Sequence, residues 1–173
     1  DLILLFHRET TPSVRLACAA ALGGLRVRAV VPALLAWLRE VQEESARREL
    51  AFAIAQIVGR DHYFIRLWRE SQSEPGTILS QALNDLKDKL PGLPEGPLRA
   101  TVERAVEALA QGNLAAAAPL LADGLRALPY ERIEGTPAAV LNECADRLTS
   151  GDARRIEYLL LALHALNAVY GED

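Results

Sequence analysis

The first half of the sequence repeats itself with a period of 32 residues. Shifting the chain by this distance lays residues 14–25 on residues 46–57, and the apolar run at 2–6 on residues 34–38. A further shift reaches a third, degenerate copy, in which the apolar positions keep the phase while Leu79 replaces the arginine of the earlier copies. A period of this length is typical of solenoids, in which each repeat buries its apolar face against its neighbours.

Each copy is predicted to form two helices. The apolar residues at 14, 18, 21, 22 and 25 follow the spacing of one stripe of an amphipathic helix. Thr11 and Pro12 provide a capping hydroxyl and a first-turn proline at its start, and Gly23–Gly24 ends it. In the third copy, Thr77 starts the second helix. Because leucine and alanine dominate the hydrophobic residues and aromatic residues are only 5% of the chain, an all-α fold is predicted.

Residues 14–23 read Val-Arg-Leu-Ala-Cys-Ala-Ala-Ala-Leu-Gly. This segment resembles the motif of HEAT repeats of the short, phycobilisome-lyase-like type, and the resemblance covers roughly residues 1–90. It implies that about three helix pairs form a right-handed α-α superhelix, a HEAT-like solenoid. Arg15 and Arg47 occupy the same position in successive copies. They resemble the arginine ladder that hydrogen-bonds neighbouring turns of HEAT solenoids.

The second half of the chain is organised differently. A break rich in proline and glycine at residues 91–97 separates residues 1–90 from residues 98–173. Gly112–Asn113 matches Gly151–Asp152 at an offset of 39. In both places glycine supplies the left-handed residue at a helix end, and Asn or Asp caps the next helix. The hairpins that this pattern predicts either continue the solenoid or cap its end, and their helices are expected near residues 98–111, 113–128, 137–150 and 152–170.

The sequence contains no nucleophile motif, phosphate-binding loop or dinucleotide fingerprint. His7, His62 and His164 lie far apart in the sequence and belong to no His-x-x-x-His or His-Glu pair. HEAT-type deoxyhypusine hydroxylases carry paired His-Glu iron ligands, so the resemblance does not extend to that enzyme. His164 lies among apolar residues and is predicted to be a core residue. We therefore expect no metal site, no cofactor and no enzymatic activity.

The second helix of each HEAT pair lines the concave face, so the resemblance also identifies candidate partner-binding positions. Arginine and aromatic residues are favoured as interface hot spots, and Phe52 is the most suggestive residue on this face. The sequence leaves open whether Phe52 faces a partner or packs under the C-terminal hairpins. The candidate residues are Arg48, Glu49, Phe52, Gln81 and Asn84.

These features predict a protein–protein interaction or scaffolding module that presents a concave helical surface to a protein partner or to another domain of its parent chain. The absence of methionine indicates a piece of a longer protein, and a missing neighbour is expected at the edge near Asp1. The alternative is a bilin lyase-like chaperone or enzyme, which rests on the repeat resemblance. A second alternative is a HEAT-like nucleic-acid-binding module, because Arg60, Arg66 and Arg69 are interleaved with aromatic residues. The net charge of −4 argues against a nucleic-acid partner.

Cysteine usage and hydropathy indicate the compartment. Cys18 and Cys144 lie on the apolar faces of predicted helices, which is typical of reduced, buried thiols in a cytoplasmic protein. Runs of consecutive apolar residues, such as residues 158–163, are at most seven residues long. A membrane span needs roughly eighteen residues or more, so no membrane association is expected.

Overall fold

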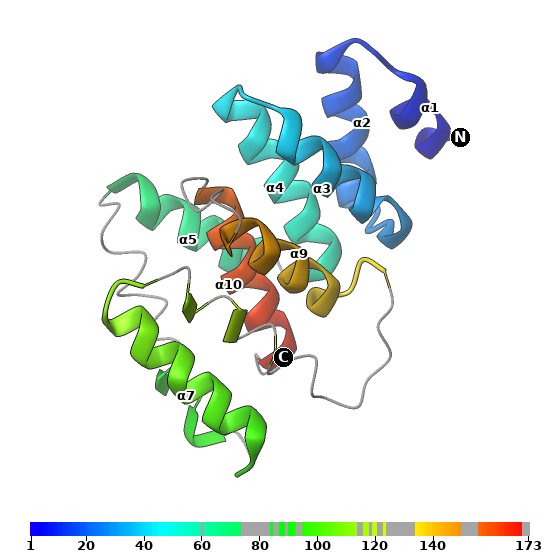
Figure 1. Ribbon diagram of the computed structural model, residues 1–173. Coiled ribbons are helices and arrows are strands. Elements are labelled where there is room, and N and C mark those ends of the chain that lie inside the picture. Colours follow the sequence, from blue (N-terminus) through cyan, green and yellow to red (C-terminus); the bar gives the residue numbers. More distant parts are fainter. Residues whose placement is uncertain are drawn as a thin grey trace.

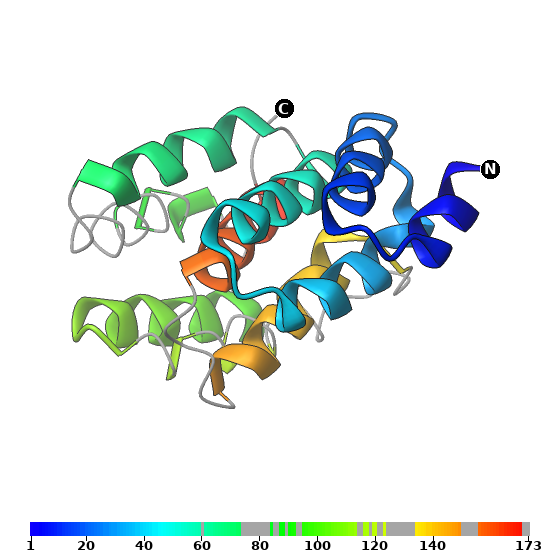
Figure 2. The same cartoon turned by 90° about the horizontal axis from the view of Figure 1, so that it is seen from above.

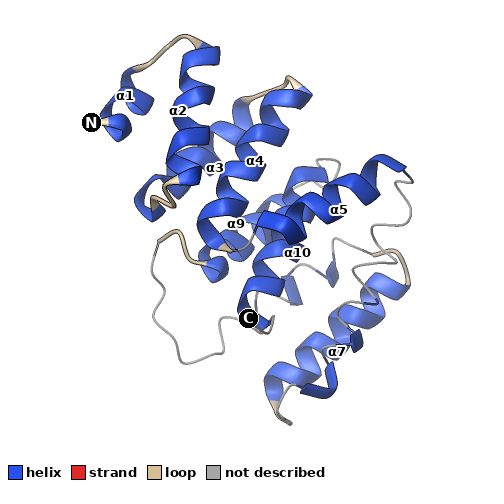
Figure 3. Ribbon diagram, turned by 180° about the vertical axis from the view of Figure 1, so that it is seen from behind, coloured by secondary structure: helices blue, strands red, loops and turns tan. Residues whose placement is uncertain are grey.

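The computed structural model describes residues 1–59, 61–73, 84, 87–88, 90–92, 95–113, 116–117, 119–120, 123, 134–149 and 156–170. Over these residues the chain is helical and contains no strand, which confirms the all-α prediction (Figure 3). None of the helices found there is long and apolar enough to cross a membrane. The helices are α1 (Leu2–Arg8), α2 (Pro12–Gly24), α3 (Val31–Glu40), α4 (Glu44–Val58), α5 (Asp61–Ser73), α7 (Pro97–Ala110), α9 (Pro137–Thr149) and α10 (Ile156–Tyr170), with 3-10 turns η1 (Arg28–Val30) and η2 (Leu90–Gly92).

The first two helix pairs follow the 32-residue period. α2 begins at Pro12, and α4 begins 32 residues later at Glu44. The carboxylate of Glu43 caps α4, because it accepts hydrogen bonds from the backbone N–H groups of Ser45 at 3.0 Å and Ala46 at 2.7 Å. Hydrogen bonds from Ser45 and Ala46 hold the pKa of Glu43 below its ordinary value.

The start of α2 differs from the prediction. Thr11 precedes the helix, but its hydroxyl makes no capping hydrogen bond, so the predicted cap is wrong. The carboxylate of Glu9 accepts hydrogen bonds from the N–H groups of Thr10 at 2.8 Å and Thr11 at 2.7 Å, both of which precede the helix. These hydrogen bonds from Thr11 and Thr10 lower the pKa of Glu9. Glu9 therefore bonds to the linker between α1 and α2 and not to the first N–H groups of α2.

α2 ends at Gly24, as predicted, but neither glycine is the left-handed residue. Arg26 adopts that conformation, with φ of 54°. The N–H of Arg26 donates to the carbonyl of Gly23 at 2.9 Å, and the N–H of Val27 donates to the carbonyl of Leu22 at 3.1 Å. This pair of hydrogen bonds is the Schellman arrangement. Gly23 has a different role: it is buried where α4 crosses α2, and a Cβ atom there would lie 2.8 Å from the Cα of Ala53.

The helix pairs stack side by side. α4 packs against α2, α3, α5 and α10, and Figure 2 shows α4 between α2 and α10. α9 lies beside α3, because Arg39 of α3 forms an ion pair with Glu143 of α9. The hairpin α9–α10 thus lies against the pair α3–α4, and α3–α4 lies against α1–α2 (Figure 1). α7 lies at the end of the molecule far from α1 (Figures 1 and 3).

One hydrophobic core joins the described parts of both sequence halves. α7 contributes Val102 and Ala105 to it, and α9 contributes Cys144. Cys18 and Cys144 are both buried free thiols, as predicted, and burial raises the pKa of the Cys144 thiol. The largest fully buried side chains in this core are Phe6, Leu22, Leu34, Leu38, Leu50, Ile54, Phe64, Leu67, Leu141 and Tyr158.

The predicted helix junction at Gly112–Asn113 is confirmed. Gly112 adopts a left-handed conformation, with φ of +70°, and the side chain of Asn113 accepts a hydrogen bond from the N–H of Ala116 at 3.1 Å. The helices expected near residues 98–111, 137–150 and 152–170 correspond to α7, α9 and α10. Thr77, Gly151–Asp152 and most of residues 113–128 lie outside the described residues.

Candidate protein-binding surface

Three of the predicted partner-binding residues lie together on α4. This helix buries Leu50, Ala53 and Ile54 in the core, which turns its opposite side outward. Arg48 and Glu49 are exposed, and Phe52 is half-buried one turn further on. The spacing of these residues follows the 3.6-residue period, so one side of α4 carries a cation, an anion and an aromatic edge.

Aromatic rings of α5 support this side of α4. The guanidinium of Arg48 lies 5.7 Å from the ring centroid of Trp68, within the range of a cation–π contact. The ring centroid of Phe52 lies 6.4 Å from that of Phe64, and Phe64 stacks on Trp68 at 6.3 Å. Phe64 and Trp68 are buried, which confirms that they are core residues. Phe52 therefore packs beside α5 and keeps a partly exposed edge.

α2 continues the surface with smaller side chains. The residues 32 positions before Arg48 and Glu49 are Leu16 and Ala17; Leu16 is half-buried and Ala17 is exposed. Ala20 occupies the position equivalent to Phe52 and is exposed. We call the residues Leu16, Ala17, Ala20, Arg48, Glu49 and Phe52 the α2–α4 surface. Of the other two candidates, Asn84 is exposed and Gln81 lies outside the described residues.

The two repeat arginines link neighbouring helix pairs. The guanidinium of Arg15 lies 4.3 Å from the ring centroid of Trp37, which belongs to the next pair. Arg47 donates through Nε to Oε1 of Glu157 on α10 at 3.2 Å, and through Nη1 to the carbonyl of Gln42. Glu157 is only 1% exposed, so its carboxylate depends on this pairing. Both arginines therefore act in packing, and neither belongs to the exposed surface.

His164 is a buried core residue, as the sequence predicts. Its Nε2 atom lies 2.9 Å from the carbonyl oxygen of Ala55, and because a carbonyl only accepts, Nε2 carries the hydrogen. Burial lowers the pKa of His164 to about 4, so the ring is neutral near pH 7. His7 and His62 are exposed. Within the described residues, no three His, Cys, Asp or Glu side chains come together in a way that could hold a metal ion.

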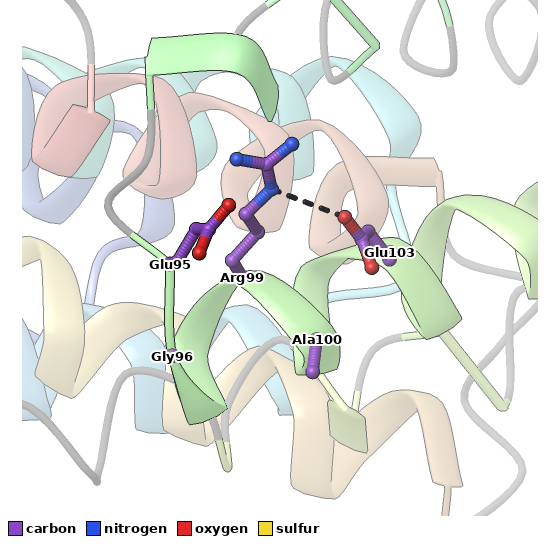
Figure 4. A pocket seen from close by; sticks show the side chains of 5 residues that line it. All are labelled: Glu95, Gly96, Arg99, Ala100 and Glu103. Atoms are coloured by element: carbon purple, nitrogen blue, oxygen red, sulfur yellow. Dashed lines mark hydrogen bonds and ion pairs between the residues drawn. The ribbon is translucent and has the colours of Figure 1, made fainter.

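Two shallow pockets lie at residues that the sequence analysis did not single out. The first, at the start of α7, has a volume of about 280 Å³; Arg99 reaches along it and donates to Glu103 at 3.1 Å, while Glu95 flanks the same arginine (Figure 4). The second has a volume of about 250 Å³ and lies between α3 and α9. In each pocket an arginine faces two glutamates, Glu95 and Glu103 or Glu134 and Glu143. Each arginine pairs with one of the two glutamates, Glu103 or Glu143, and each volume is below the range typical of small-molecule sites.

Comparison of the chain with protein-family models, with curated proteins and with solved structures finds no match. The function is therefore inferred from the residues and their geometry alone.

Proposed function

We propose that this chain is a protein–protein interaction module that recognises its partner through the α2–α4 surface. One observation carries the proposal: Arg48 and Glu49 are exposed on a helix whose other sides are packed, and the guanidinium of Arg48 lies over Trp68. The 32-residue period and the contacts of Arg15 and Arg47 with the next helix pair support a HEAT-like, right-handed α-α superhelix as the scaffold.

The α2–α4 surface has the properties that protein recognition requires. Its residues lie on helices anchored in the core, so little side-chain and backbone freedom remains to be lost on binding. Arg48 offers a planar group with several donors for a carboxylate or a carbonyl of the partner. The half-buried ring of Phe52 and the methyl groups of Ala17 and Ala20 supply apolar area beside it. We expect a partner segment with an acidic residue next to an apolar one.

The buried free thiols Cys18 and Cys144 support a reducing compartment such as the cytoplasm. The partner is a protein or another domain of the parent chain. The scaffold role requires no bound cofactor.

The test reverses the charge of one residue on the surface. Wild-type protein is used to capture a partner, which is identified and purified, and its Kd is then measured with the variants Arg48→Glu and Arg8→Glu. Arg8 is exposed at the end of α1 and serves as the matched control. We expect Arg48→Glu to weaken binding by about thirtyfold, the effect of a hot spot worth roughly 2 kcal/mol, and Arg8→Glu to leave it unchanged.

Unchanged affinity of Arg48→Glu, with the helical content and unfolding temperature of the wild type, would refute the proposal. Two further results would replace it by another function. A bilin-dependent absorption shift would indicate a bilin lyase-like protein. Retention on heparin that falls steeply with salt would indicate a nucleic-acid-binding module.

A further inference from the structure

The exposed large hydrophobic side chains of the described residues all belong to the first helix pair or to the residue that follows it. Among the described residues they are Leu4, Leu5, Val14 and Leu25, which belong to α1, to α2 or to the residue after α2, and Leu25 is 69% exposed. α1 and α2 lie at the end of the molecule opposite α7 (Figure 1). Exposed apolar residues that lie together mark an interaction site more often than scattered single residues do, so the question is what this helix pair would contact.

The repeat shows what such a face contacts. In the second helix pair, Trp37 packs edge-on against Phe6 of the first pair, with ring centroids 5.8 Å apart. Ala53 lies against Gly23 of the first pair, closely enough that a Cβ on Gly23 would meet it at 2.9 Å. Trp37 and Ala53 are both buried by these contacts.

The same positions of the first pair are uncovered. The residue 32 positions before Trp37 is Leu5, which is 46% exposed, and the residue 32 positions before Ala53 is Ala21, which is also exposed. Gln56, which also approaches Gly23, corresponds to Gly24, where a Cβ would meet nothing within 4 Å. The first pair therefore presents the face that its successor uses for stacking, with no helix of the described residues against it.

We propose that this edge, formed by Leu5, Ala21, Gly24 and Leu25, binds a helical hairpin of the chain's own 32-residue repeat type. The hairpin would pack on α1–α2 as α1–α2 packs on α3–α4. The second helix of the hairpin must carry glycine or alanine at the position equivalent to Gly23. It would cross α2 at Ala21 as closely as α2 crosses α4 at Ala53, which leaves no room for a larger side chain. The proposal concerns a different surface from the α2–α4 surface and does not depend on it.

Within the described residues, a folded second copy of this chain does not offer such a hairpin. The observed contact joins the Gly23 side of one pair to the Ala53 side of the next, so it is not self-complementary. In a folded copy the Gly23 side of α2 is covered by α4, and the equivalent Ala55 of α4 is covered by His164 of α10. A hairpin whose corresponding side is free is therefore the occupant that fits.

The probe is the chain's own first repeat. Residues 1–32 are duplicated directly before Asp1 of the full chain, so that Val31 and Pro32 of the added copy precede Asp1 as they precede Ala33 in the protein. We expect the unfolding temperature to rise by about 5 °C or more and amide hydrogen exchange in the original α1 to slow at least about tenfold, because α1 becomes an internal helix. Ala21→Arg in the original copy should abolish both effects.

The control is Ala21→Arg in the chain without the duplication, which should keep the wild-type unfolding temperature because Ala21 is exposed there. The proposal is overturned if the duplicated repeat leaves the unfolding temperature unchanged, or if the increase persists with Ala21→Arg. It is also overturned if the unfused chain dimerises at micromolar concentration and Ala21→Arg restores the monomer, since the occupant would then be a second copy.

Discussion

Replacing Gly23 with alanine should destabilise the protein, although alanine is the better helix former. Gly23 is buried in α2, and an added Cβ would lie 2.8 Å from the Cα of Ala53 and 2.9 Å from its Cβ. Contact with a backbone atom cannot be relieved by rotating a side chain, so α2 and α4 must move apart. Gly24, the next residue in the same helix, is exposed and has open space where a Cβ would stand. It is therefore the matched control.

The magnitude follows from two opposing effects. Replacing glycine with alanine inside a helix gains up to about 1 kcal/mol, less near a helix end, and both variants share this gain. Overpacking a close contact costs roughly 1–3 kcal/mol, and only Gly23→Ala incurs this cost. We expect Gly24→Ala to be neutral or stabilising, and Gly23→Ala to be less stable than Gly24→Ala by about 1–3 kcal/mol.

Urea unfolding followed by circular dichroism measures both free energies directly. For a chain of this size the difference corresponds to a gap of roughly 3–9 °C between the two unfolding temperatures. If Gly23→Ala is as stable as Gly24→Ala, α2 and α4 do not approach as closely as the structure shows, and the packing of the first two repeats described here is wrong.

Two further predictions concern the second half of the chain. Because burial lowers the pKa of His164 from 6.5 to about 4, the unfolded state takes up a proton between these pH values and the folded state does not, so the free energy of unfolding should fall by about 3 kcal/mol as the pH drops from 6.5 to 4. The variant His164→Leu should lose this part of the pH dependence, and identical pH profiles of the two proteins would contradict the buried neutral ring. Gly135 has φ of +73°, and a Cβ there would lie 2.5 Å from the carbonyl oxygen of Arg28. Gly135→Ala should therefore lower the free energy of unfolding, measured in urea, by at least about 1–3 kcal/mol. An unchanged free energy would show that the start of α9 does not lie against η1.

Local features of the fold could be predicted from the sequence because short-range rules determine them. The 32-residue period predicts that α2 and α4 start at equivalent positions, and the glycine followed by asparagine at 112–113 predicts a helix junction. The errors are also local and physical. The hydroxyl of Thr11 makes no capping hydrogen bond at the start of α2, whereas the carboxylate of Glu9 accepts from the N–H groups of Thr10 and Thr11 in the linker before the helix.

The order of packing could not be predicted, because periodicity says which face of a helix is buried but not by which helix. α10 lies against α4 although 97 residues lie between Val58, the last residue of α4, and Ile156, the first residue of α10. Glu157 could have suggested this contact, because a carboxylate at the start of an apolar helix needs a cation. Arg47, an arginine in a repeat position, is the cation that it pairs with. The support of Arg48 by Trp68 was missed for the same reason, since it joins α4 to α5.

The most direct test of the stack is a double-mutant cycle between Arg47 and Glu157, which lie 110 positions apart and meet only if α10 packs on α4. Arg47→Met leaves a buried carboxylate without its partner, Glu157→Gln removes the charge, and the double variant removes both. Urea unfolding of the four proteins should give a coupling free energy of about 1–3 kcal/mol, the range for residues in one buried ion pair. Additive effects, with a coupling within roughly 0.5 kcal/mol of zero, would mean that the two side chains do not interact and that α9–α10 does not lie against the second repeat.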